Sequence, residues 1–161
     1  MNVPPDLYSE ITQFISSEAD ILDHKEYVDW LNLWTDSGLY IVPVDHTNTD
    51  YRNSLNVAYD DAEMRQLRID RLTSGEAVST HKAQNTVRTL SRIRVLDDID
   101  GLIRVRAAYC LYESKKGIMR EFPADVHYKL VRDSEGNLKM EEKVVNILKS
   151  DEYLSTIAYL F

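Results

Sequence analysis

The sequence predicts an α+β fold in which a curled antiparallel sheet wraps around N-terminal helices and forms a cone with one open mouth. Three observations carry this prediction. Apolar residues recur at the helical period of about 3.6 in the first part of the chain and at period 2 beyond Gly75. Helices that precede a run of hairpin-connected strands are typical of α+β proteins rather than of alternating βαβ proteins. The predicted strands are long, and long strands twist and curl a sheet.

Two helices are predicted at the start of the chain. The first is defined by one apolar face at helical spacing, whose members are Leu7, Ile11, Phe14, Ile15 and Leu22. Asp23 followed by Glu26 has the form of a capping box and predicts that a second, shorter helix begins there. This helix would carry an aromatic and apolar face of Tyr27, Trp30, Leu31 and Trp34. The Asp-Ser-Gly stretch at 36–38 would end it, and both tryptophans are expected in the core.

A strand, a polar excursion and a third helix are predicted next. Residues 39–44 form a dense apolar run typical of a strand, and Pro43 predicts that this strand ends at a sheet edge. Residues 45–54 are polar, and residues 55–59 predict a brief strand. Asp60 and Glu63 have the spacing of a second capping box, which predicts a helix as far as about Thr73. Its inward residues would be Met64, Leu67 and Leu72.

The second half of the chain is predicted to be a meander of strands joined by hairpin turns. The strands would cover residues 87–96, 102–113, 118–132 and 138–148. Alternation in the first predicts one shared face of Val87, Thr89, Ser91, Ile93 and Val95. In the second, the shared face would be Ile103, Val105, Ala107, Tyr109 and Leu111. Pro123, in the middle of the third, predicts a bulge or a sharp bend.

Composition predicts a single globular domain over residues 1–161 and excludes several classes of protein. The net charge of −8 has the wrong sign for a phosphate-backbone binder, so no nucleic-acid partner is expected. No apolar stretch is long enough to span a bilayer, so we expect a cytoplasmic protein with no membrane partner. The single Cys110 rules out an internal disulfide, a four-cysteine zinc site and a cysteine-ligated iron–sulfur cluster. The four histidines are scattered singly and no glycine-rich phosphate loop is present, so neither a metal nor a cofactor is expected in this chain.

Arginines recur along the first two strands of the meander, at Arg88, Arg92, Arg94, Arg104 and Arg106. One interpretation is a stripe that binds an anion or a partner. The other is a solvated sheet face whose arginines pair with neighbouring acids, for which the 27 carboxylates provide many partners. We favour the second interpretation.

A set of polar residues could line the inside of the cone and act as acid, base and orienting groups: Tyr40, His81, Asp125, His127 and Tyr128. Such an interior would suit isomerisation or dehydration of a small hydrophobic substrate. Strand alternation argues against the set, because Asp125 and His127 share one face of their strand while Tyr128 points to the other. Histidine and tyrosine are also common as hydrogen-bonded core residues.

The last part of the sequence is apolar, with Leu154, Ile157, Ala158, Tyr159, Leu160 and Phe161. Apolar side chains at a chain end are unfavourable in water, which leaves two alternatives: the segment folds back onto the sheet, or it packs against another subunit. We favour the second and expect Tyr159, Leu160 and Phe161 at a subunit contact.

Five segments carry a family resemblance: residues 18–23 with the aromatic run 27–33, the strand Tyr-Ile-Val-Pro at 40–43, residues 59–61 with 67–72, residues 88–91, and residues 143–148 with the apolar tail. Together they resemble the small (beta) subunits of aromatic-ring-hydroxylating dioxygenases, which are Rieske non-haem iron oxygenases. The likeness covers nearly the whole chain in the same order. No single segment is specific, and the set together carries the resemblance.

The resemblance implies the cone-shaped fold of nuclear transport factor 2, also called cystatin-like, which ketosteroid isomerase and scytalone dehydratase share. It implies a large alpha-subunit partner that carries a Rieske iron–sulfur cluster and a mononuclear iron, commonly as three alpha and three beta chains. NADH would supply electrons through a reductase. The small subunit would be structural and would self-associate as a trimer, with no catalytic, cofactor or metal residue to assign.

Two hypotheses about function follow. In the first, the chain is the structural subunit of a dioxygenase complex that adds oxygen to an aromatic ring, and another chain carries the chemistry. In the second, it is a free-standing isomerase, dehydratase or cyclase that uses Tyr40, His81, Asp125 and His127 on a small hydrophobic substrate. A ligand-binding or dimerising module of the same fold is a third, weaker alternative.

Overall fold

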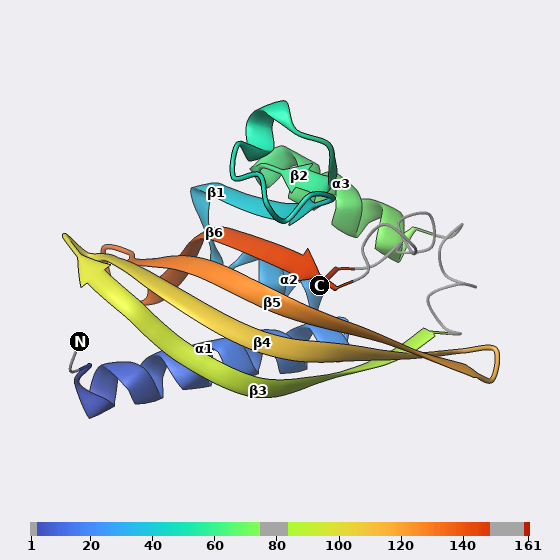
Figure 1. Cartoon of the computed structure of the whole chain (residues 1–161), viewed down its shortest axis with the longest axis horizontal. Helices are drawn as coiled ribbons and strands as arrows, with labels where there is room; N and C mark the ends of the chain where they lie inside the picture. Colours follow the sequence, from blue (N-terminus) through green and yellow to red (C-terminus); the bar gives the residue numbers. More distant parts are fainter. Residues whose placement is uncertain (1–2, 75–83, 149–159) are drawn as a thin grey trace.

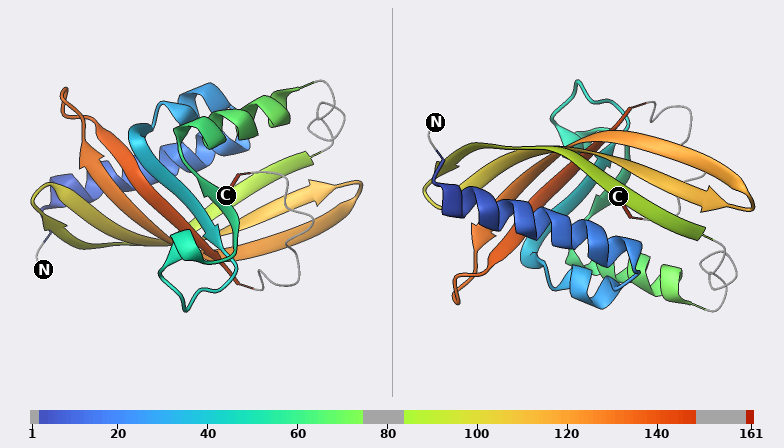
Figure 2. Two further views of the ribbon diagram at one scale, coloured as in Figure 1. Left: turned by 90° about the horizontal axis from the view of Figure 1, so that it is seen from above. Right: turned by 90° about the horizontal axis from the view of Figure 1, so that it is seen from below.

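The computed structural model describes residues 3–74, 84–148 and 160–161. Within these ranges a six-stranded, strongly curled sheet forms one layer, and the α-helices gather on one side of it (Figures 1 and 2). The elements are α1 (Pro5–Asp23), α2 (Tyr27–Leu31), β1 (Trp34–Pro43), the short 3-10 helix η1 (Tyr51–Asn53), β2 (Asn56–Asp60), α3 (Ala62–Thr73), β3 (Gln84–Ile99), β4 (Leu102–Lys115), β5 (Ile118–Arg132) and β6 (Leu138–Ile147). No helix in the described part of the chain is long and apolar enough to cross a membrane.

The strand order is β2-β1-β6-β5-β4-β3. Strands β3 to β6 form the predicted antiparallel meander, which confirms the α+β class. The sheet as a whole is mixed, because β1 pairs with β6 in parallel. No hairpin joins these two strands, since the whole meander separates them in sequence, so turn geometry does not impose an antiparallel pairing. The β1 strand is internal, and the edge strands are β2 and β3, which corrects the edge position predicted from Pro43.

The predicted second helix is shorter than expected, and β1 begins where that helix was expected to continue. Helix α2 ends at Leu31, Trp34 opens β1, and Gly38 lies inside the strand rather than at a helix end. A Cβ atom on Gly38 would lie 2.7 Å from the Trp34 ring and 2.9 Å from the Met140 carbonyl oxygen. This glycine therefore permits close packing inside the sheet, which corrects the prediction that it ends a helix. Trp30 and Trp34 are buried as predicted, with ring centroids 5.4 Å apart.

The face that helix α3 presents to the sheet agrees with the prediction only at Leu72, which is partly buried against the core. Arg65 and Ile69 are buried, whereas Met64 and Leu67 are each 41% exposed. The Arg65 guanidinium donates to the Gly38 carbonyl oxygen and lies 4.2 Å over the Trp34 ring, so an arginine occupies the place expected for an apolar residue.

The N-terminal cap of α3 is also one residue later than predicted. Asp61 caps the helix, its carboxylate accepting from the Met64 amide at 2.9 Å. The carboxylate of Asp60, the predicted cap, pairs instead with Arg68, whose Nε lies 2.6 Å away. A short carboxylate can perform either task, and two consecutive aspartates leave the capping position undetermined by pattern alone.

Two register shifts decide which side chains of β3 and β6 face the helices. Ser91 in β3 and Glu141 in β6 have no partner across the ladder, so the alternation of side chains reverses at each of them. Before Ser91 the inward residues of β3 are Arg88 and Leu90, and Val87 is 60% exposed. The predicted continuous face from Val87 to Val95 is therefore wrong in its first half.

The predicted bulge at Pro123 is absent from the β4–β5 ladder, where Pro123 pairs with Cys110 without a register shift. The Pro123 carbonyl oxygen accepts from the Leu148 amide at 2.9 Å, so its nitrogen also faces the β6 side. The last β5–β6 pair is Ala124 with Ile147, so the missing N–H of Pro123 lies where that ladder ends. The inward face predicted for β4 is confirmed, because Ile103, Val105, Ala107, Tyr109 and Leu111 are all buried.

Candidate functional site

A buried ion pair lies at the centre of the space between α1 and the sheet. Glu18 on α1 and Lys143 on β6 have side chains that are 2% and 1% exposed, and Lys143 Nζ lies 2.6 Å from Glu18 Oε1. Glu18 also accepts hydrogen bonds from Trp30 Nε1 at 3.1 Å and from the Tyr128 hydroxyl at 2.9 Å. A buried carboxylate is tolerated when its oxygens are satisfied in this way.

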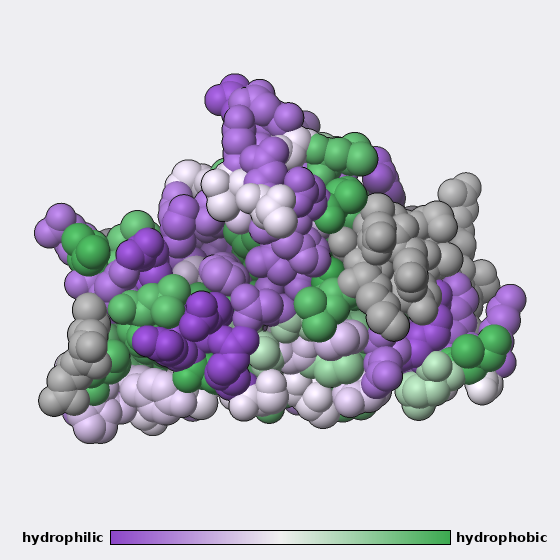
Figure 3. All heavy atoms as spheres, in the orientation of Figure 1, coloured by the Kyte–Doolittle hydropathy of each residue, from purple (hydrophilic) through white to green (hydrophobic). Residues whose placement is uncertain are grey.

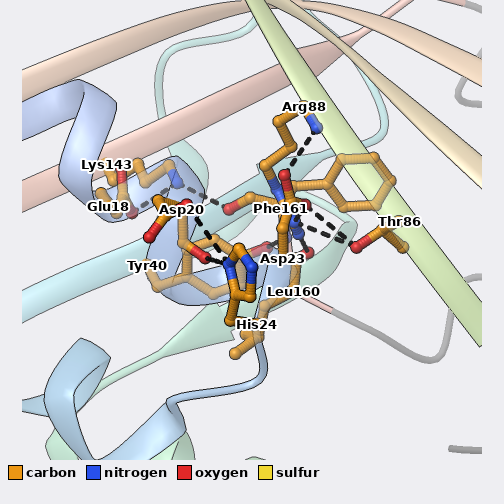
Figure 4. A network of polar contacts seen from close by, with 10 residues as sticks. All are labelled: Glu18, Asp20, Asp23, His24, Tyr40, Thr86, Arg88, Lys143, Leu160 and Phe161. Carbon is orange, nitrogen blue, oxygen red and sulfur yellow. Dashed lines mark hydrogen bonds and ion pairs between the residues drawn. The ribbon is translucent and has the colours of Figure 1, made fainter. Parts of the chain in front are cut away.

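The same lysine connects this ion pair to the last two residues of the sequence (Figure 4). Lys143 Nζ donates to the Phe161 main-chain oxygen at 2.6 Å, and the Phe161 amide donates to the Tyr40 hydroxyl at 3.0 Å. The Leu160 carbonyl oxygen accepts from the Arg88 guanidinium, which also pairs with Asp23 of α1. The Leu160 carbonyl oxygen and the Phe161 amide and main-chain oxygen therefore each have a side-chain partner.

Leu160 and Phe161 are each 1% exposed within their own chain, and the Phe161 ring packs edge-on against Phe122 with centroids 5.8 Å apart. The structure thus places these two residues in the folded-back arrangement, the alternative that the sequence favoured less. Tyr159 lies outside the described residues. A contact between the end of this chain and another subunit stays a prediction.

The buried phenols hold their protons firmly. Burial raises the pKa of Tyr40 to about 12, although the hydrogen bond with Phe161 acts in the opposite direction. Burial also raises the pKa values of Tyr109 and Tyr128 well above the usual value of 10.0. Burial lowers the pKa of Lys143, and Glu18 opposes that change. These phenols can donate or accept hydrogen bonds, but they are poor general bases near neutral pH.

A second polar cluster lies on the outer face of the sheet. Asp125 accepts a hydrogen bond from Arg92, and its other oxygen lies 2.9 Å from His127 Nε2. Their side chains are between 36% and 45% exposed. Burial raises the pKa of Asp125, but the hydrogen bonds from Arg92 and His127 outweigh this and leave the pKa below its usual value.

The residues of the catalytic alternative are therefore not brought together. Tyr40 and Tyr128 are buried inside, whereas Asp125 and His127 are exposed on the opposite face, as strand alternation indicated. His81 lies outside the described residues. No group of three or more histidine, cysteine, aspartate or glutamate side chains that could hold a metal occurs in the ranges that the structure describes.

The arginine row is divided between the two faces. Arg92 and Arg104 are paired on the outer face, with Asp125 and Asp97, as the second interpretation expected. Arg88 is turned inside by the register shift at Ser91 and is 3% exposed. Hydrophilic residues predominate on the face shown in Figure 3, with hydrophobic residues in small separate groups.

Glu18 and Lys143 were not predicted as site residues, although the sequence carries a signal for each. Glu18 occupies a helical position on the same face as Ile11, Ile15 and Leu22, where a charged residue is unexpected. Lys143 directly precedes the apolar residues Val144, Val145 and Ile147 of β6. Pairing these two opposite charges would have predicted the central ion pair.

Comparison with known proteins gives consistent results. The family model described as "Ring hydroxylating beta subunit" matches residues 17–151. The small oxygenase component of the p-cumate 2,3-dioxygenase system from Pseudomonas putida is 32% identical over 137 residues, covering 84% of this chain and 76% of that protein. The beta subunit of biphenyl 2,3-dioxygenase from Rhodococcus jostii is 22% identical over 170 residues, covering 99% and 91%.

Solved structures show the same fold. The beta subunit of benzoate 1,2-dioxygenase from Burkholderia mallei has a TM-score of 0.77 at 16% identity, covering 94% of this chain and 96% of that chain. An NTF2-like protein with a cystatin-like fold from Novosphingobium aromaticivorans has a TM-score of 0.65 at 12% identity, covering 92% and 88%. The predicted cone-shaped fold is confirmed.

Proposed function

Because the chain belongs to the ring-hydroxylating beta-subunit family, we propose that it is the structural, non-catalytic small subunit of a multicomponent aromatic-ring dioxygenase. Its task would be to hold the large, iron-bearing alpha subunits in their assembly. The reaction, incorporation of oxygen into an aromatic ring, would take place on the alpha subunit.

One observation about the interior carries the structural role. Glu18 and Lys143 inside the cone bond to each other, and Lys143 and Tyr40 also bond to the chain's own Phe161. An enzyme site keeps some polar groups available to its substrate, and here the central carboxylate, ammonium and phenol already have partners. The interior therefore supports a scaffold better than it supports the isomerase, dehydratase or cyclase alternative.

The cofactors of the complex do not fit this chain. A Rieske cluster takes two cysteine and two histidine ligands, and the sequence contains one cysteine, Cys110. We propose that the Rieske cluster and the mononuclear iron are held by the alpha subunit, and that NADH supplies electrons through a reductase. The assembly would contain three alpha and three beta chains, with the beta chains forming a trimer, in the cytoplasm.

Purification of the chain from its native host tests this proposal. We expect a larger chain to co-purify, with Rieske-type visible absorbance, bound iron and the mass of three alpha and three beta chains by light scattering. The same assembly carrying Asp125→Asn or His127→Gln should turn over an aromatic substrate at an unchanged rate. A colourless, iron-free homo-oligomer would overturn the dioxygenase role, and a tenfold fall in turnover with assembly intact would overturn the non-catalytic role.

A further inference from the structure

We propose that the interior of the cone is a binding site for an N-acylated aromatic amide, and that Leu160 and Phe161 of the same chain occupy it in this structure. The atoms of such a ligand that the site would contact are an aromatic ring, one N–H donor and two carbonyl acceptors. The proposal goes beyond the structural role proposed above and does not depend on it.

The polar half of the site consists of three side chains from three strands. Arg88 of β3 donates to the Leu160 carbonyl oxygen. The Tyr40 hydroxyl of β1 accepts from the Phe161 amide at 3.0 Å, and Lys143 of β6 donates to the Phe161 oxygen at 2.6 Å. A few converging polar groups in a mostly apolar pocket are what fix a small ligand in place.

The apolar half of the site receives the aromatic ring. Phe161 packs edge-on against Phe122 of β5, with an interplanar angle of 86°. Tyr109 lies next to this space, its ring 5.8 Å from Lys143 Nζ. The Tyr109 side chain is 4% exposed, and its hydroxyl has no hydrogen-bond partner among the described residues. A buried hydroxyl without a partner is unfavourable, and a ligand with one more polar atom than the dipeptide could satisfy it.

Two cations, Arg88 and Lys143, point toward the position of Leu160 and Phe161. Arg88 and Lys143 face inward because Ser91 and Glu141 shift the register of their strands. Bulges that redirect a side chain are frequent beside functional sites. Both cations pair with carboxylates there, and each also donates to the same dipeptide.

Each cation of the site has a counter-charge of its own. Lys143 is paired with Glu18, and Arg88 is paired with Asp23. The contacts that the two cations offer a ligand are therefore charge-assisted hydrogen bonds to its oxygen atoms.

N-acetyl-L-phenylalaninamide is the probe that reproduces all four contacts. Its acetyl oxygen takes the place of the Leu160 oxygen, and its N–H takes the place of the Phe161 amide. Its ring packs against Phe122, and its amide oxygen reaches Lys143. N-acetyl-L-alaninamide is the matched control, because it keeps the polar atoms and lacks the ring.

The experiment compares the full chain with a chain that stops at Tyr159, each in its native assembly, by calorimetric titration and thermal unfolding. We expect the shortened chain to bind the probe at least tenfold more tightly than the full chain, and its unfolding temperature to rise with probe concentration. N-acetyl-L-alaninamide should bind at least tenfold more weakly than the probe. Tyr40→Phe in the shortened chain should weaken binding of the probe severalfold.

A folded, shortened chain that binds the probe no better than the full chain, or no better than it binds the alanine control, overturns the proposal. If the shortened chain does not fold, Phe161→Ala in the full chain replaces it, with the same expectation. If that variant also fails to fold, refolding in the presence of the probe should restore it, and failure of this rescue overturns the proposal.

Discussion

The two polar clusters of this protein lie on opposite faces of one sheet and contain the same kinds of group. Inside, Lys143 and Glu18 form an ion pair that is 1% and 2% exposed. Outside, Arg92 and Asp125 form one that is 45% and 36% exposed. On β5, the neighbours His127 and Tyr128 belong to different clusters because successive side chains of a strand point to opposite faces. The two clusters therefore differ in burial and not in residue type. The buried groups depend on their protein partners, whereas water also stabilises the exposed groups.

Removing the buried lysine should have the largest effect. Lys143→Met leaves the Glu18 carboxylate buried without its counter-charge, and we expect the free energy of unfolding to fall by about 3–5 kcal/mol. Urea unfolding of the purified chain measures this. Lys129→Met is the matched control, because Lys129 pairs with Glu142 at 2.9 Å on the outer face and is 40% exposed. The control should lose less than about 1 kcal/mol.

The double variant Glu18→Gln with Lys143→Met separates the cost of the unpaired charge from the cost of the lost hydrogen bonds. Without the buried carboxylate, the missing lysine leaves no unpaired charge, so the double variant should be about 1–2 kcal/mol more stable than Lys143→Met alone. A double variant that is less stable than the single variant would show that hydrogen bonds from Glu18 to Trp30 and Tyr128 matter more than the charge.

This comparison also shows what could be predicted from the sequence. The fold class followed from hydrophobic periodicity and from the order of helices and strands, which depend on many residues at once. The inward positions of Arg88 and Lys143 depend on single unpaired residues, Ser91 and Glu141, which nothing in a local pattern marks. Strand alternation correctly separated His127 from Tyr128, because no register shift falls between them.

The folded-back position of Phe161 could not be predicted for a related reason. The partners of Leu160 and Phe161 come from four strands and meet only when the sheet is assembled: Arg88 for Leu160, and Tyr40, Phe122 and Lys143 for Phe161. The apolar character of the segment was visible in the sequence, and its destination was not. The Gly38 position was misjudged similarly, because the close contact with Trp34 depends on how β1 packs.

The ion pair of Arg120 and Glu113 is intermediate in burial, so breaking it should cost an intermediate free energy of unfolding. The cost should also depend on which partner is removed. Arg120 Nε donates to Glu113 Oε1 at 2.8 Å, and the two side chains are 24% and 0% exposed. Arg120→Met leaves a fully buried carboxylate unpaired and should cost about 2–3 kcal/mol of unfolding free energy. Glu113→Gln leaves a guanidinium that water can reach and should cost about 1 kcal/mol. Equal losses in urea unfolding would contradict the argument that burial of the remaining partner decides the cost.

The outer cluster should give the smallest effect, and one that depends on pH. The pKa of Asp125 is lowered in the folded protein by Arg92 and His127, against the effect of burial. A carboxyl group with a lowered folded pKa contributes stability above its unfolded pKa, and this stability is lost as the pH falls through the folded pKa. Asp125→Asn should therefore be less stable than the original chain by at most about 1 kcal/mol at pH 7.

The difference between Asp125→Asn and the original chain should begin to shrink as the pH falls below the ordinary carboxyl pKa of about 4, and it should disappear below the lower pKa of the folded protein. Urea unfolding at a series of pH values measures the stability of the original chain and of the variant. Asp133→Asn is the control, because Asp133 lies at a hairpin turn and its carboxylate accepts hydrogen bonds chiefly from backbone amides. A difference well above 1 kcal/mol at pH 7 would mean that Asp125 is buried in the protein as it exists in solution. Since the group is 36% exposed in the single chain, another subunit would then have to cover this face. Asp125→Asn, which should have the smallest effect among the three ion pairs, thus also tests whether the outer face of the sheet is an interface.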